Sequence, residues 1–219
     1  SVRDFAPAMV RVKSGGTTVA GTLLAANLAG LKVFATGGIG GVHRDAPFDV
    51  STDLIGLSRT PLVVVCAGAK AILDIPATLE VLETYGVPVI GYQTGDFPAF
   101  YSRSSGLPVS ARADTPEQVA QIAQAHWGLG LNSAVLVCVP PPEEVALPTE
   151  AVAGAINQAL AEAQAAGIHG QAVTPFLLQR VGELTHGSSL RTNLSLLRNN
   201  ARVAAQIADY IRKLKPQVV

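Results

Sequence analysis

One lysine stands in a stretch whose side chains are almost wholly apolar. Lys70 follows a run of valines and lies between Cys66 and Asp74, with only alanine, glycine, isoleucine and leucine between them. Burial favours the neutral form of a lysine amine, and a neutral amine is a nucleophile that forms Schiff bases with aldehydes. The same pattern also suits a lysine that reaches solvent or pairs with Asp74. Lys70 is therefore a candidate covalent catalyst, with these two alternatives open.

A glycine-rich segment precedes this lysine. The four glycines of Gly37–Gly41 let the backbone turn sharply and approach a ligand closely, and successive free N–H groups there can bind an anion such as phosphate. The spacing fits neither a Walker loop nor a dinucleotide fingerprint, so a tight turn without a ligand is the alternative. His43 and Arg44 follow directly and favour an anion or sugar site, although a lone histidine such as His43 also suits a structural hydrogen bond.

The next polar group is Asp49-Val50-Ser51-Thr52-Asp53. Ser51 or Thr52 before Leu54 would cap a helix. Two carboxylates flanking two hydroxyls also suit a hard cation or the hydroxyls of a sugar. The two roles are compatible.

Two further groups have both a functional and a packing interpretation. The aromatic residues of Phe97–Tyr101 could wall a pocket for a flat base, or fill a loop. Asn193 and the pair Asn199 and Asn200 interrupt a helical pattern, where asparagine is mildly unfavourable. They indicate either a polar task or an exposed helix face.

The elements that must position these groups alternate along the chain. Four continuously apolar runs are typical of strands covered on both faces: Lys32–Thr36, Leu62–Ala67, Val87–Gly91 and Ser133–Cys138. Helical patterns lie before, between and after them: Thr17–Leu28, Pro76–Tyr85, Thr115–Trp127, Thr149–Ala166, Pro175–Leu184 and Leu190–Leu214. This alternation predicts a single α/β domain over residues 1–219, a three-layer α/β/α fold with a largely parallel central sheet. Ligands of such sheets gather beyond the carboxyl ends of the strands.

Composition narrows the classes of partner. The 219 residues contain 16 acidic and 16 basic side chains, so bulk charge favours neither nucleic acid nor a membrane surface, while a small phosphorylated ligand remains open. No apolar run approaches the length of a membrane span. Cys66 and Cys138 lie in apolar runs and are interpreted as buried thiols, which fits a cytoplasmic location.

The chain resembles a known family, pseudouridine-5'-phosphate glycosidase, also described as indigoidine synthase A-like. The motifs that carry the resemblance run from near Gly15 to Ala201: GGTTVAGT, VFATGGIGGVHR, DVSTDL, VVCAGAKAILD, TLEVLETYGVPVIGYQT, TPFLL and ELTHGSSLRTNLSLLRNNA.

The resemblance implies a homotrimeric α/β/α enzyme that uses manganese (Mn2+). Its reaction is the reversible cleavage of the C–C glycosidic bond of pseudouridine 5'-phosphate to uracil and ribose 5-phosphate. By motif, Lys70 matches the Schiff-base lysine and Asp49 the metal-binding aspartate. The substrate-binding positions implied, together with His43, are Val19, Ser51, Thr52, Asp53 and Asn193.

The start of the chain differs from the pattern of this family. The family has a catalytic glutamate and a substrate-binding lysine before the segment that matches Ser1–Asp4, and we expect this chain by itself to lack both. Two further hypotheses therefore stand beside the glycosidase: another Schiff-base lyase acting on sugar phosphates, and an inactive ligand-binding fragment. Release of uracil distinguishes the first of these from the glycosidase, and binding without turnover identifies the second.

Overall fold

The fold is built on one sheet of five parallel strands, seen in a computed structural model that describes residues 1–44, 46–168 and 170–213. Across the sheet the order is β1 (Val33–Ala35), β4 (Val63–Cys66), β8 (Val135–Cys138), β6 (Val89–Tyr92) and β7 (Ala111–Ala113). Every neighbouring pair is parallel. The last of these strands in the chain, β8, therefore lies at the centre.

The side chains of the central strands belong to two separate hydrophobic clusters. In β4, Val64 and Cys66 join the cluster on one face, while Val63 and Val65 join the cluster on the other. Successive side chains of a strand point to opposite faces, so both faces of the sheet must be covered. This explains why the strands are apolar at every position.

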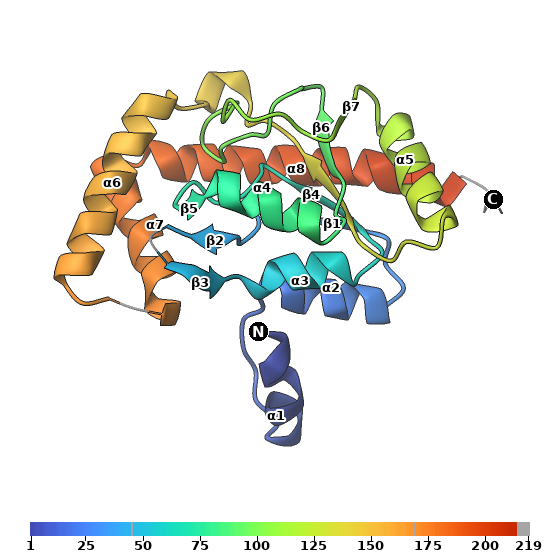
Figure 1. The fold of residues 1–219 in the computed structure, drawn as a ribbon, viewed down its shortest axis with the longest axis horizontal. Coiled ribbons are helices and arrows are strands. Elements are labelled where there is room, and N and C mark those ends of the chain that lie inside the picture. The colour runs from blue at the N-terminus through green and yellow to red at the C-terminus, as the bar shows by residue number, and fades with distance from the viewer. Residues whose placement is uncertain (45, 169, 214–219) are drawn as a thin grey trace.

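Helices form a layer on each face, as the sequence predicts (Figure 1). The first cluster includes residues of α2 (Val19–Leu28), α3 (Thr52–Ser58) and α4 (Ile75–Thr84), and the second includes residues of α5 (Pro116–Gly128) and α8 (Ser188–Lys213). The three-layer α/β/α prediction with a largely parallel sheet is confirmed.

The remaining helices lie around this body. α6 (Thr149–Ala165) and α7 (Val173–Leu184) stand together at one end of the molecule, and α1 (Phe5–Val10) projects away from it (Figure 1). Short 3-10 turns, η1 (Val2–Asp4), η2 (Glu143–Val145) and η3 (Gly170–Ala172), complete the set. In the described ranges, no helix is both long and apolar enough to cross a bilayer.

A second, antiparallel sheet was not predicted. Its order is β3 (Ala46–Val50), β2 (Val42–His43) and β5 (Leu73–Asp74). Two of these strands have only two residues each, too few for alternation to be visible in the sequence. The other predicted elements are found with different ends, and Leu214, the last residue of the longest predicted helix, lies outside the described residues.

The two cysteines end adjacent strands. Cys66 and Cys138 are partners in the β4–β8 register, and both are free and buried. Burial, and then the neighbouring Cys66 thiol, raise the pKa of the Cys138 thiol well above its ordinary value. The interpretation of these residues as buried thiols is confirmed.

Candidate active site

The loops that leave β1 and β4 run side by side beyond the carboxyl edge of the sheet. The Ala67 nitrogen donates to the Gly37 carbonyl at 2.8 Å, and the Ile39 nitrogen donates to the Gly68 carbonyl at 3.0 Å. The Lys70 nitrogen then donates to the Ile39 carbonyl at 3.1 Å. This ladder extends the parallel pairing past the strands, so the glycine-rich segment fixes the backbone position of Lys70.

A cleft of about 510 Å³ opens above these loops, a volume within the range of small-molecule sites. Five of the residues singled out in the sequence line it together: Val19, His43, Ser51, Asp53 and Lys70. The rest of the lining is rich in hydroxyl groups and comprises Thr17, Thr18, Thr22, Phe34, Thr36, Gly38, Gly40, Leu73, Thr174 and Pro175.

Lys70 lines this cleft. Its side chain is half-buried, and within the described part of the chain no hydrogen bond or ion pair engages its amine. Asp74 does not pair with it, because the Asp74 carboxylate caps α4 by accepting from the Ala77 nitrogen at 3.0 Å. The alternative in which Lys70 is held by Asp74 is therefore not found.

Asp53 holds two parts of the cleft together. The carboxylate is only 4% exposed. One oxygen accepts from the Ala20 nitrogen at 2.8 Å and the other accepts from the Gly40 nitrogen at 2.8 Å. Asp53 thus joins the first turn of α2 to the glycine-rich segment, and its negative charge suits the N-terminus of a helix.

Ser51 caps α3, as predicted. Its hydroxyl accepts from the Asp53 nitrogen at 3.2 Å. Thr52 is the first residue of α3 and does not line the cleft. A side chain at Gly40 would place its Cβ 2.2 Å from the Ser51 hydroxyl oxygen, so glycine is needed there for this close approach and not for backbone freedom.

Asp49 lies outside the cleft lining. It is exposed on β3, beside Phe48, which is 99% exposed. Among residues 1–44, 46–168 and 170–213, no group of three or more histidine, cysteine, aspartate or glutamate side chains could hold a metal ion. Any metal at Asp49 would therefore have at most one further histidine, cysteine, aspartate or glutamate ligand from these described residues.

Asn193 lies on α8 beside the glycine-rich segment and outside the cleft lining. A Cβ built on Gly37 would lie 3.3 Å from the Asn193 side-chain oxygen, which places this amide against the glycine-rich segment. About two helical turns further along α8, Asn200 is fully buried, and its amide nitrogen donates to the Thr36 carbonyl at 2.8 Å. Asn200 therefore has a polar task at the base of the same loop, whereas Asn199 is only partly buried.

Several N–H groups in and directly after the glycine-rich segment are bonded within the protein. The nitrogens of Ile39, Gly40 and Val42 donate respectively to the Gly68 carbonyl, the Asp53 carboxylate and the Thr78 hydroxyl. These three N–H groups are engaged within the protein, and anion binding by other N–H groups of the segment stays a prediction.

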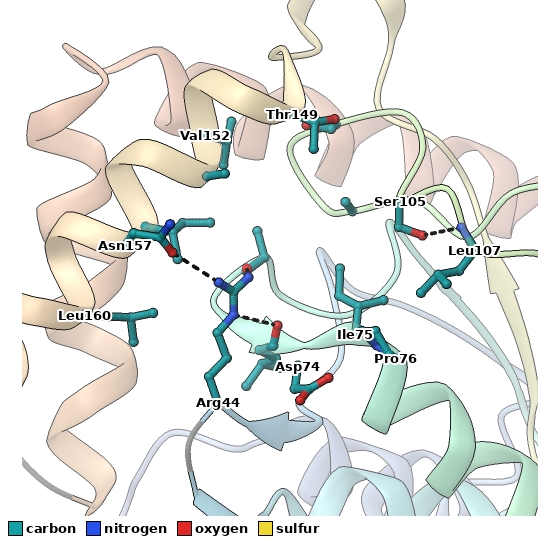
Figure 2. Close-up of a pocket in the computed structure, with 16 residues that line it drawn as sticks. Arg44, Asp74, Ile75, Pro76, Ser105, Leu107, Thr149, Val152, Asn157 and Leu160 are labelled. Atoms are coloured by element: carbon teal, nitrogen blue, oxygen red, sulfur yellow. Dashed lines mark hydrogen bonds between the residues drawn. The ribbon is translucent and has the colours of Figure 1, made fainter.

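Arg44 turns away from the Lys70 cleft and lines a second cavity of about 560 Å³ between α4 and α6 (Figure 2). Its guanidinium donates to the carbonyls of Ala71 at 3.0 Å and Leu73 at 3.2 Å, and to the Asn157 side-chain oxygen at 3.4 Å. Arg44 therefore stabilises the loop after Lys70 and is not positioned to bind an anion in the cleft.

The aromatic side chains of Phe97–Tyr101 lie in the hydrophobic core. Phe97, Phe100 and Tyr101 are 0%, 4% and 3% exposed, and the rings of Phe100 and Tyr101 meet edge to face at 4.7 Å. A Cβ at Gly38 would lie 2.7 Å from the Phe100 ring. These rings support the glycine-rich segment from within, as ordinary loop packing.

Sequence reasoning missed the hydroxyl-bearing residues of the cleft. Thr17, Thr18, Thr22, Thr36 and Thr174 all line it. Thr18 also caps α2 by accepting from the Gly21 nitrogen at 3.2 Å. The signal that could have found them is the repetition of threonine within three of the motifs that carry the family resemblance.

Comparisons with known proteins identify relatives of this chain. Residues 1–210 match the family described as indigoidine synthase A like protein. A protein of Gemmatimonas aurantiaca named pseudouridine-5'-phosphate glycosidase is 58% identical over 208 residues, which are 95% of this chain and 68% of the relative. A relative of the same name from Chloroflexus aurantiacus is 56% identical over 219 residues, covering 98% of this chain and 72% of the relative.

Two solved structures share the fold. The prealnumycin C-glycosynthase AlnA, solved in complex with ribulose 5-phosphate, superimposes with a TM-score of 0.91 at 40% identity, over 97% of this chain and 71% of that one. An indigoidine synthase A-like protein of Thermotoga maritima gives a TM-score of 0.89 at 36% identity, over 95% and 69% of the two chains. On the match along nearly its whole length, the chain belongs to the indigoidine synthase A-like family of enzymes, whose curated relatives here bear the name pseudouridine-5'-phosphate glycosidase.

Proposed function

We propose that the chain cleaves and forms the C–C glycosidic bond of pseudouridine 5'-phosphate, with uracil and ribose 5-phosphate as the other partners. The observation that carries the proposal is the Lys70 amine, which no described residue pairs with, in a cleft rich in hydroxyl groups. The names of the relatives support the same reaction, and so does the structural neighbour, a C-glycosynthase bound to a sugar phosphate.

In the synthetic direction, the Lys70 amine condenses with the aldehyde of open-chain ribose 5-phosphate and releases water. The resulting C1'=N iminium is an electron sink. Carbon 5 of uracil attacks C1', the iminium electrons return to nitrogen, and the proton on carbon 5 is lost. The ribose 4'-hydroxyl oxygen then bonds to C1' and closes the ring, while the C1'–N bond breaks and the hydroxyl proton passes to the departing Lys70 amine. Cleavage is the reverse, with the bond electrons leaving on the base as carbon 5 is protonated.

The other candidate site residues are assigned to binding and positioning. We propose that His43, Ser51 and Asn193 contact the sugar or base, with Thr52 and Val19 at the margins of the same site. Asp53 acts mainly through the backbone, because both of its oxygens are already engaged by N–H groups.

Manganese is part of the proposal in a limited form. A carboxylate is a suitable ligand for such a hard cation, which is commonly held by one or two carboxylates together with water and substrate phosphate. Asp49 would be the protein ligand, and the exposure of its carboxylate leaves room for water and substrate oxygens. The ion would supply charge neutralisation for the phosphate.

We propose a homotrimer in the cytoplasm as the working form. The side chains of Leu190, Leu194 and Leu197 support an assembly, because they are 58%, 51% and 39% exposed along one side of α8 and are suited to burial against another subunit. The free thiols of Cys66 and Cys138 suit a reducing compartment.

Borohydride trapping with ribose 5-phosphate tests the central step. We expect a reduced sugar-phosphate adduct on the peptide that contains Lys70, and none in a Lys70→Ala variant. Lys32→Ala is the matched control, because Lys32 is exposed and lies outside the cleft lining.

Three outcomes are informative. An adduct on Lys70 together with uracil release from pseudouridine 5'-phosphate supports the proposal. An adduct without uracil release favours a different Schiff-base lyase or a ligand-binding fragment. Folded protein that forms no adduct on Lys70 would overturn the proposal.

A further inference from the structure

A third cavity lies beyond the carboxyl ends of β6 and β8, separate from the Lys70 cleft. Its volume is about 230 Å³, and it shares no lining residue with the cleft. Its lining combines the end of β6, a loop, the exit from β8 and one side of α8: Tyr92, Gln93, Arg103, Val139, Pro140, Pro142, Asn199, Arg202 and Val203. The carboxyl edge of a parallel sheet is where ligands of this fold class bind.

Two guanidinium groups and no carboxylate belong to this lining. Arg103 and Arg202 are exposed, and neither forms a salt bridge with a described residue. An arginine carries five N–H donors in a planar fork that matches the oxygens of a phosphate or carboxylate. The cavity therefore carries positive charge that the described residues do not neutralise.

Each guanidinium is oriented by one neutral partner. Arg103 donates to the Pro141 carbonyl at 2.8 Å, and Arg202 donates to the Asn199 side-chain oxygen at 2.9 Å. These bonds use one terminal nitrogen of each group, and no described residue is bonded to the other nitrogens. Arg202 also acts on the Tyr92 phenol, where it opposes the effect of burial, which raises the pKa of that group.

The backbone of this cavity is constrained in an unusual way. Gln93, the residue after β6, has a φ of 58°, which a residue with a side chain rarely adopts. Its nitrogen donates to the Ala113 carbonyl at 2.8 Å and its side-chain amide donates to the Asp114 carbonyl at 3.2 Å. Such strain persists only where the surroundings enforce it, and it concentrates at ligand sites. The prolines that follow β8 make the facing wall rigid.

We propose that this cavity is a binding site for a small oxyanion of the phosphate class, held between Arg103 and Arg202. A volume of about 230 Å³ is below that of pockets for drug-sized ligands, which favours inorganic phosphate or the phosphate end of a small ester over a whole nucleotide. The proposal concerns a site other than the one that contains Lys70.

Calorimetric titration with inorganic phosphate at constant ionic strength tests the site. The titrated protein carries Lys70→Met, so that the cation of the other cleft is removed. We expect one binding site, with a dissociation constant at least about tenfold weaker in an added Arg202→Gln variant, because charge-assisted bonds to the anion are lost. Arg198→Gln is the matched control, since Arg198 is exposed on the same helix but outside the cavity.

Arg103→Lys provides a second variant that keeps the positive charge and a donor for the Pro141 carbonyl while removing the planar fork. It should also weaken phosphate binding, and circular dichroism should show that every variant is folded. Methyl phosphate in place of phosphate distinguishes an ester from the free ion. Absence of phosphate binding, or equal weakening by Arg198→Gln and Arg202→Gln, would overturn the proposal.

Discussion

Replacing Asp53 with asparagine should destabilise the protein strongly, because one buried carboxylate holds two backbone segments. Its two oxygens accept from the Ala20 and Gly40 nitrogens, both at 2.8 Å, and the side chain is 4% exposed. An amide keeps one acceptor oxygen, but its NH₂ group must face the other N–H donor. One bond is thus lost outright, and the other loses its charge.

The magnitude follows from these two bonds. A hydrogen bond to a charged group contributes about 1.5–3 kcal/mol, and a buried donor left without a partner adds a cost of similar size. Since the loop can relax, we expect Asp53→Asn to lower the free energy of unfolding by about 2–4 kcal/mol. For a chain of this length, that corresponds to a fall in Tm of roughly 4–16 °C.

Urea and thermal unfolding followed by circular dichroism provide the measurement. Asp49→Asn is the control, because this exposed carboxylate lies four residues away, and its replacement should change stability by no more than about 0.5 kcal/mol. If the Asp53 variant were as stable as the Asp49 variant, Asp53 could not be the link between α2 and the glycine-rich segment.

Three other predictions follow from the same structure. Gly40→Ala places a Cβ 2.2 Å from the Ser51 hydroxyl oxygen and should cost about 1–3 kcal/mol, whereas Gly95→Ala, which meets nothing within 4 Å, should leave Tm nearly unchanged. Burial lowers the pKa of His126, so the unfolded chain binds protons more readily than the folded protein. The free energy of unfolding should therefore fall as pH drops below about 6.5. If the His126→Gln variant lost as much Tm over the same drop in pH, this explanation would be contradicted. Asp49→Ala should weaken the activation of pseudouridine 5'-phosphate cleavage by manganese, and unchanged activation would place the metal elsewhere.

Much of the fold was predictable because the central strands are covered on both faces. Burial on both sides made Val63–Cys66 and Val135–Cys138 continuously apolar, and the helix caps at Thr115 and Asp74 stand directly before prolines or apolar runs. The two-residue strands β2 and β5 leave no such pattern. Their pairing depends on a contact between His43 and Leu73, which are far apart in the sequence.

The location of a site residue was predictable where the residue directly follows a strand of the parallel sheet. Lys70 follows a parallel strand, so it had to lie at the carboxyl edge of the sheet. Arg44 could not be placed in this way, because its orientation depends on carbonyls of Ala71 and Leu73 and on Asn157 of α6. The catalytic and binding roles of the site residues stay predictions until the trapping experiment is made.

The order of the central sheet has a consequence for folding during synthesis. Among the strands of residues 1–44, 46–168 and 170–213, β8 is the last to leave the ribosome, yet it lies between β4 and β6. Until Val135–Cys138 is available, the β1–β4 pair and the β6–β7 pair each have an apolar edge with unpaired backbone groups, a feature that promotes aggregation. We therefore expect nascent chains that end before β8 to require chaperones, and completion of this one short strand to join the two halves of the core.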